Sequence, residues 1–270
     1  VRDSKQAEAE EKPALIRPED RFLPYPPLTI AQCREFSVAM AAEALESMIT
    51  AFSLIDAYSD EGFREVEKLE EKSDQYEDTI GTYIMKITRS ELSGRQNAKV
   101  SEFLHTLPDF ERISDHALNV AETAKEIHEK GITYSDYAKK ELQVVQNAVI
   151  EIVSMTVDAF TSTDLILAAK VEPLEEVVDD LCDEIKLHHV ERLQQGLCSL
   201  EQGFTFNDLL VSYERISDHC SNIALALLEL EADTFNTHEH LKNMGSKKQA
   251  YFDQNYAEFQ QKYSLPTASE

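Results

Sequence analysis

The chain has 270 residues and a formal net charge of −25 at pH 7, with 51 acidic against 26 basic side chains. Such a surface repels nucleic acid and anionic lipid head groups, so we expect no nucleic-acid partner and an attraction for cations or basic protein faces. Seven glycines, eight prolines, no tryptophan and many helix-forming residues argue against a sheet-rich fold and predict an all-α one.

The first stretch, residues 1–28, is predicted to be a linker, because it mixes charge with five prolines and shows no apolar period. Thr29 is expected to cap a helix that runs to about Ala57, along which apolar side chains recur about every 3.6 residues.

Two further helices complete a first unit over residues 29–131. One runs from about Asp60 to Leu92, and the other from about Gln96 to Lys130. Gly131 ends the last helix, and Pro108 predicts a kink or break within it. Three helices joined by short turns predict an antiparallel three-helix bundle.

The second unit, residues 132–232, repeats this plan. We expect helices at about Tyr134–Leu167, Lys170–Gln195 and Thr205–Glu231. The tail, residues 233–270, lies outside the repeat, and its five aromatic residues between Tyr251 and Tyr263 indicate one short extra helix. No uninterrupted apolar run approaches the roughly 20 residues of a membrane span.

A tandem duplication explains why the second half resembles the first. The sequence ERISDH occurs at Glu111–His116 and again at Glu214–His219, 103 residues later. Upstream of each copy, residues 66–80 and 171–185 match at an offset of 105. The fold expected from this is two tandem antiparallel three-helix bundles.

Acidic residues of the repeat are expected to meet between the second and third helices. On the third helix Glu111 and Asp115 point away from the apolar stripe, and on the second helix the acids flank the stripe. In an antiparallel pair, residues equally far from the turn lie level. The midpoint of Asp74 and Asp115 is 94.5, within the predicted turn.

Converging carboxylates repel one another, and a cation that prefers oxygen ligands neutralises them. We therefore predict metal binding, with iron, zinc, manganese or magnesium as candidates. The simpler alternative is a solvated acidic face, and the recurrence of the pattern in both units favours metal. The predicted ligands are Glu70, Asp74, Glu77, Glu111 and Asp115 in the first unit, and Glu175, Asp179, Glu214 and Asp218 in the second.

We predict other roles for the residues next to these acids. His116 and His219 lie about 100° around the helix from the aspartates, so we expect them not to be ligands. Asn119 and Asn222 follow one turn later and are left as hydrogen-bond donors or ligands. Arg112 and Arg215 are expected to pair with adjacent acids.

Signals of catalysis are few, and we predict no catalytic residue and no enzyme. Glu102 and His105 have the Glu-x-x-His spacing of di-iron bundles. The second unit has no counterpart, which disfavours the alternative of a metal-dependent oxidase. Phosphate-binding loops and zinc-protease helices are absent from the sequence.

At these residues the sequence resembles the PhoU family, whose domains are paired three-helix bundles with repeated Glu/Asp-x-x-x-Asp motifs. The matching pairs are Glu70 with Asp74, Glu111 with Asp115, Glu175 with Asp179, and Glu214 with Asp218. The run LPDFERISDHALNVAE is the most specific match. The resemblance implies metal clusters on the bundle surface and a regulatory role in phosphate signalling, with a transporter and a sensor kinase as partners.

Residues 17–41, RPEDRFLPYPPLTIAQCREFSVAMA, look more like the junction in bacterial sodium/phosphate cotransporters in which a PhoU-like domain follows the membrane segments. This resemblance implies a cytoplasmic regulatory domain, tethered to the inner membrane, that controls phosphate uptake. The alternative is a freestanding PhoU-type regulator that acts on a separate transporter or sensor kinase. Homo-oligomer formation, the direction of regulation and the identity of the metal stay open.

Overall fold

The computed structural model describes residues 20–234 and 245–266, and no strand occurs within these ranges. The all-α prediction is confirmed. Most of the predicted linker and part of the predicted tail lie outside the described residues. The elements are η1 (Asp20–Phe22), α1 (Pro26–Asp56), α2 (Asp60–Ile87), α3 (Gly94–Lys130), α4 (Asp136–Ser162), α5 (Leu165–Ala168), α6 (Val171–Gln194), α7 (Leu200–Thr234) and α9 (Gly245–Lys262).

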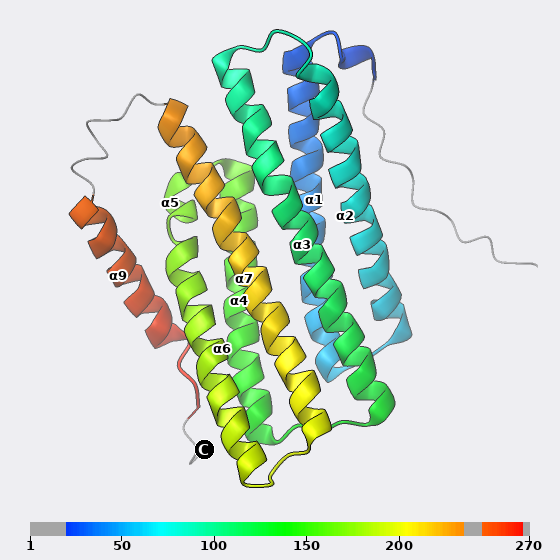
Figure 1. The fold of residues 1–270 in the computed structure, drawn as a ribbon, viewed down its shortest axis with the longest axis vertical. Helices are drawn as coiled ribbons and strands as arrows, with labels where there is room; N and C mark the ends of the chain where they lie inside the picture. Colours follow the sequence, from blue (N-terminus) through cyan, green and yellow to red (C-terminus); the bar gives the residue numbers. More distant parts are fainter. Residues whose placement is uncertain (1–19, 235–244, 267–270) are drawn as a thin grey trace, which may run out of the picture.

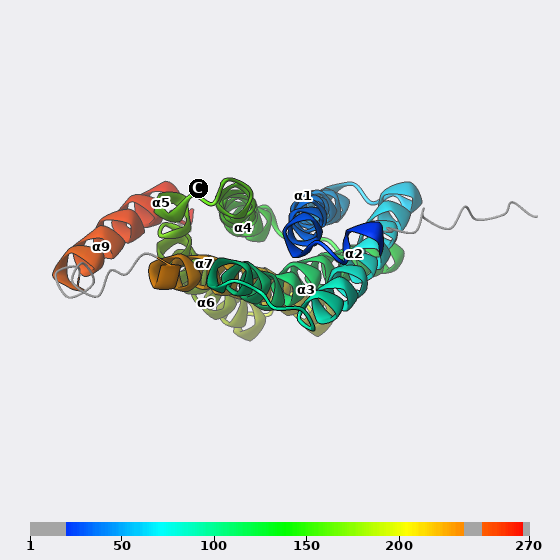
Figure 2. The ribbon, with the colours of Figure 1, turned by 90° about the horizontal axis from the view of Figure 1, so that it is seen from above.

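The long helices form two layers, which the end-on view of Figure 2 separates. α2, α3, α7 and α6 lie side by side in one layer, and α1 and α4 cover one side of it. Consecutive helices of each unit run antiparallel (Figure 1), and α3 packs along α7 at the centre of the larger layer. The prediction of two tandem three-helix bundles is confirmed.

The two bundles share one hydrophobic core. Phe52 of the first unit contacts Tyr213 of the second, with ring centroids 4.9 Å apart, and Phe110 meets Phe160 at 5.0 Å. All four rings are buried. Since burying one large apolar side chain is worth about 1.5–3 kcal/mol, these contacts hold the units in a fixed relation.

Serine caps set the register of both helical hairpins. The Ser93 hydroxyl accepts a hydrogen bond from the backbone N–H of Gln96, whose side chain accepts one from Ser93 N. Ser199 and Gln202 make the same reciprocal pair at the start of α7. Such capping boxes satisfy N–H groups that the first helical turn leaves unpaired. The helix expected from Thr205 therefore begins earlier, at Leu200.

Other predicted helix boundaries also differ from the structure, and α2 ends at Ile87 instead of Leu92. α1 begins at Pro26, because proline suits a first turn, and the hydroxyl of Thr29 donates to the carbonyl of Phe22 at 2.8 Å instead of capping. The helix expected to reach Leu167 ends at Ser162. α3 continues through Pro108 without a break, since core packing on both sides of that residue holds the helix together.

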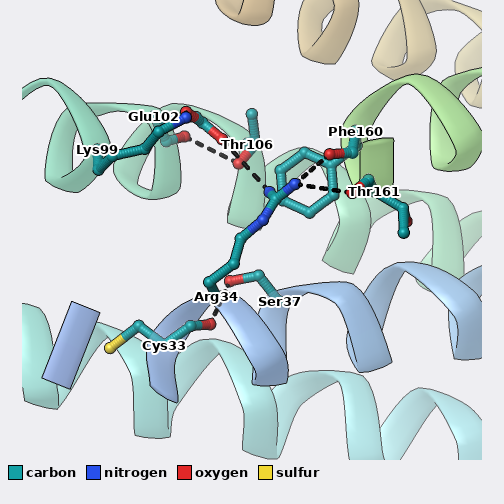
Figure 3. A network of polar contacts seen from close by, with 8 residues as sticks. All are labelled: Cys33, Arg34, Ser37, Lys99, Glu102, Thr106, Phe160 and Thr161. Carbon is teal, nitrogen blue, oxygen red and sulfur yellow. Dashed lines mark hydrogen bonds and ion pairs between the residues drawn. The ribbon is translucent and has the colours of Figure 1, made fainter. Parts of the chain in front are cut away.

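Arg34 of α1 ties the first unit to the second (Figure 3). Its guanidinium donates to the carbonyl oxygens of Phe160 and Thr161 at the C-terminal end of α4, and pairs with Glu102 of α3 at 3.4 Å. A cation at this end of a helix interacts favourably with the helix dipole. Glu102 is 2% exposed and also accepts a hydrogen bond from Lys99 at 2.6 Å.

The C-terminal tail forms the one short helix that its aromatic residues indicated. α9 packs along α6, and Phe259 and Tyr263 are buried there. The Tyr256 hydroxyl donates to Asp180 of α6, and Tyr263 hydrogen-bonds to Glu151 of α4. The helix is therefore docked on the second unit by two tyrosine–carboxylate contacts and an apolar seam.

Two helices, α1 and α4, are long and apolar enough to cross a membrane by length and composition. Both also supply side chains to the shared core, and about half of each apolar window is buried inside the structure. The same composition is typical of the central helix of a helical bundle.

Removing the Arg34 side chain is expected to destabilise the fold. Arg34→Met removes one of the two cations that pair with the buried Glu102 and leaves Lys99, so we expect a loss of about 2–4 kcal/mol in the free energy of unfolding. Urea unfolding followed by circular dichroism measures it. Arg34→Met with Glu102→Met should recover part of the loss. Arg64→Ala, at an exposed position of α2, is the control and should change stability by less than about 0.5 kcal/mol.

Candidate functional site

The first acidic cluster lies in the groove between α2 and α3. One carboxylate oxygen from each of Glu70, Asp74 and Asp115 lies within 4.8 Å of the other two. The predicted convergence of α2 and α3 acids at one level is therefore present. Asp74 is exposed, and the other two are partly buried. This is a surface cluster that solvent ions can reach.

Glu77 and Glu111, the other predicted residues of this unit, lie at the edge of the cluster, outside that 4.8 Å group. Burial raises the pKa of Glu111 to about 7. The charge of Asp115 adds to the rise, Arg112 opposes it, and Glu77 adds to it again. Burial is likewise the largest cause of the raised pKa of Glu77. All the acids of this groove thus share one electrostatic site.

The second cluster repeats this geometry between α6 and α7. Oxygens of Glu175, Asp179 and Asp218 lie within 4.8 Å of one another, and all three residues are partly buried. Burial, followed by the charges of Asp179 and Asp218, raises the pKa of Glu175 to about 7. Burial and the charge of Asp218 raise the pKa of Asp179 to about 6. Each of these carboxylates therefore lies in the electrostatic field of its neighbours.

Glu214 is the predicted ligand that this second group does not include. Its carboxylate accepts a hydrogen bond from the ammonium of Lys186 at 2.6 Å. Sequence reasoning missed Lys186. The one signal in the sequence is the comparison of the two repeats, in which Lys186 stands where the first unit has Gly81.

One acid of the second cluster has an oxygen atom without a partner. The Oδ1 atom of Asp179 is buried and accepts no hydrogen bond from the described part of the chain. Leaving a buried carboxylate oxygen unsatisfied costs free energy, which a cation or an ordered water at this point removes. Asp179 thus has an oxygen atom that could still accept an interaction in the groove.

Arginines border both clusters, as expected from the sequence. Arg112 contacts Asp115 at 3.1 Å and Arg215 contacts Asp218 at 3.2 Å. Both arginine side chains are more than half exposed, and ion pairs of this kind are worth at most about 1 kcal/mol. Neither arginine therefore neutralises its cluster.

Two histidines lie at the centre of the layer, between the two clusters. His116 of α3 stacks on the equivalent His219 of α7, with ring centroids 5.7 Å apart. His219 also contacts Asp109 at 2.8 Å, and the amide of Asn222 donates to the same carboxylate at 3.2 Å. Asn119 lies 3.4 Å from His116. None of these residues belongs to either 4.8 Å group of the described residues.

Contact between equivalent residues of two antiparallel helices places an approximate twofold axis between α3 and α7 (Figure 2). Both acidic clusters therefore belong to the same four-helix layer. The apolar faces of α3 and α7 point toward α1 and α4, and the clusters occupy the grooves that this packing leaves.

Glu102 and His105 do not form a metal site with other acids. Glu102 is buried in the ion pairs of Figure 3, with Arg34 and Lys99, and His105 is exposed. The Glu-x-x-His spacing in this chain therefore belongs to the connection between the two units, and the di-iron arrangement is not built.

Comparison with known proteins agrees with this architecture. The PhoU domain family matches residues 38–124 and 142–227, one match for each unit. The phosphate-specific transport system accessory protein PhoU homolog 1 of Thermotoga maritima is 28% identical over 138 residues, which are 51% of this chain and 58% of that protein. The chain thus spans less than two thirds of that relative's length.

A second relative is matched over a longer stretch. The phosphate-specific transport system accessory protein PhoU homolog of Pseudomonas aeruginosa is 27% identical over 194 residues, 71% of this chain and 78% of that protein. The crystal structure of PhoU from Pseudomonas aeruginosa superposes with a TM-score of 0.71 at 23% identity, covering 77% of this chain and 99% of that one.

The phosphate transport system regulatory protein PhoU from Streptococcus pneumoniae has the same fold, with a TM-score of 0.68 at 15% identity over 76% of this chain and 96% of that one. Because the family match covers both repeats and more than half of the residues, this chain belongs to the PhoU domain family.

Proposed function

We propose that the chain is a regulator of phosphate transport, not an enzyme, and that it acts in the cytoplasm on a separate membrane transporter or sensor kinase. The family match over both repeats carries this proposal. The relatives compared above are accessory proteins of phosphate-specific transport systems, which favours this alternative over a domain within a sodium/phosphate cotransporter.

The cotransporter reading is the second candidate, and the Pro-rich sequence of residues 17–41 is the observation that favours it. The two readings differ in where the natural protein is found. Fractionation of the native host separates them: a peripheral regulator leaves the membrane in high salt or carbonate, whereas a transporter domain stays in the membrane pellet.

We further propose that each acidic cluster holds metal. The carboxylates that would hold it are those of Glu70, Asp74 and Asp115 in one groove and of Glu175, Asp179 and Asp218 in the other. Carboxylate oxygens at this density suit hard cations such as iron, manganese, magnesium or zinc. The unpartnered oxygen of Asp179 supports the fit. A bound cation would offer its free coordination positions to phosphate oxygens.

Acidic surface charge limits which partners suit this protein. With a net charge of −25, the chain is attracted to basic protein faces and repelled by nucleic acid. We therefore propose a basic surface on the partner, and no nucleic acid. Light scattering of the purified chain measures whether two copies assemble.

Metal content tests the chemical half of the proposal. Protein purified without chelator should carry at least one metal ion per chain by elemental analysis, and Asp115→Asn with Asp218→Asn should remove most of it, because one aspartate is lost from each group. Glu129→Gln, at an exposed position of α3, is the control and should retain it. Metal-free wild-type protein that also fails to take up added Mn²⁺ would contradict the proposal.

The stability of the metal-free protein should depend on pH. Glu111 and Glu175, with pKa values near 7, hold protons that the unfolded chain releases near pH 4.5, so their contribution to the free energy of unfolding falls as pH rises through this range. The lowered pKa of His116, about 4 mainly because of burial, acts in the opposite direction. Comparing wild type with a variant that lacks both acids therefore separates their contribution to stability from that of His116.

The double variant Glu111→Gln with Glu175→Gln should have the same free energy of unfolding as wild type at pH 4.5. At pH 7.5 its free energy of unfolding should be higher by about 1 kcal/mol, after allowance for solvent screening. Thermal unfolding in a chelating buffer gives the difference, and saturating metal should reverse its sign. A gap between variant and wild type that is independent of pH would show that the pKa values of these acids are not raised in the folded protein.

Phosphate uptake tests the regulatory half. Deleting the gene in its native host should change the rate of uptake of labelled phosphate under phosphate-replete conditions by several-fold, and wild-type protein should restore it. The Asp115→Asn and Asp218→Asn double variant, expressed at the same level, should not. Restoration by Glu129→Gln is the control, and an uptake rate unaffected by deletion would overturn the proposal.

A further inference from the structure

The two acidic clusters differ at two equivalent positions on the helix that carries most of their acids. Matching the repeats at an offset of 105 aligns Glu77 with Cys182 and Gly81 with Lys186. Cys182 is fully buried, and its Sγ lies 3.8 Å from the carbonyl of Leu210. The second unit has thus replaced one carboxylate with a core residue and added a cation.

Lys186 contacts an acid at the edge of the second cluster. Its ammonium lies 2.6 Å from Glu214, the residue equivalent to Glu111, and 3.4 Å from Asp183 on the same helix. Its side chain is 30% exposed. The second groove therefore contains a positive charge for which the first unit, with Gly81 at the equivalent position, has no counterpart.

The net charges of the two grooves differ as a result. In the first groove five predicted ligands face one arginine, whereas in the second groove four predicted ligands face one arginine and one lysine. With all of these side chains counted as ionised, their formal charges add up to −4 in the first groove and −2 in the second. A divalent ion is drawn more strongly to the first groove, because attraction scales with the charge of the acids around it.

We propose that Lys186, by pairing with Glu214 at the edge of the second cluster, weakens metal binding there, so that the chain binds metal more tightly, and more of it, in the first cluster. This inference rests on the proposed metal binding. The ammonium already satisfies Glu214, and a second cation next to it would meet repulsion between like charges. Lys186 thereby determines how many ions each half of the molecule holds.

Gly81 allows the reciprocal exchange. A Cβ atom built on Gly81 meets nothing within 4 Å, so a side chain introduced at this position begins in open space. Lys186→Ala should make the second cluster resemble the first, and Gly81→Lys should make the first resemble the second. Lys68→Ala is the matched control, because it removes a positive charge from α2 that pairs with Glu65, a residue outside both clusters.

The experiment titrates chelator-treated full chain with Mn²⁺, following bound metal by equilibrium dialysis and elemental analysis. Each cluster is measured alone, the second in an Asp115→Asn background and the first in an Asp218→Asn background. Lys186→Ala should tighten Mn²⁺ binding by the second cluster by about tenfold or more, and Gly81→Lys should weaken binding by the first to a similar degree. Lys68→Ala should change neither.

Two negative results have different meanings. Wild-type protein that binds no Mn²⁺ at either cluster would overturn the metal proposal and this inference with it. Equal affinities of the two clusters, unchanged by Lys186→Ala and by Gly81→Lys in chains that circular dichroism shows to be folded, would overturn the inference and leave metal binding intact. Either exchange acting alone on its own cluster supports the role of Lys186.

Discussion

Repulsion between carboxylates on facing helices is the constraint on which the rest of the structure depends. Glu70 and Asp74 face Asp115 across the α2–α3 groove at a separation that ionised acids reach only when something holds the helices together. The apolar seam beneath them does so, since the stripe from Phe110 to Ile127 on α3 is buried. Core packing therefore opposes a charge repulsion that the protein would lower by binding a cation.

The duplicated arrangement makes both grooves parts of one body. α3 and α7 contact along the approximate twofold axis, and Arg34 connects the first unit to the end of α4. A change in the spacing of one helical hairpin must therefore be accommodated by the shared core, in which aromatic side chains of both units interlock. On the proposed function, an ion bound at one cluster would therefore act on a core that both halves of the molecule share.

The fold and the convergence of acids could be predicted from sequence because each depends on local spacing. The stripe positions set the buried faces, and the Ser93 turn sets the level of Asp74 against Asp115. The shared core could not be predicted, because contacts such as Phe52 with Tyr213 join residues far apart in the chain. The break expected at Pro108 was wrong because tertiary packing outweighed a local preference.

The difference in charge between the two acidic clusters affects how each groove could bind phosphate. A groove with excess negative charge repels a phosphate anion, so on the proposed function only a groove whose metal reverses the local potential can receive it. Lys186 lowers the negative charge of its own groove permanently, whereas the first groove would depend on a bound metal for this. The two halves of a nearly symmetric molecule would then respond to different concentrations of cation, a distinction that its duplicated sequence alone does not require.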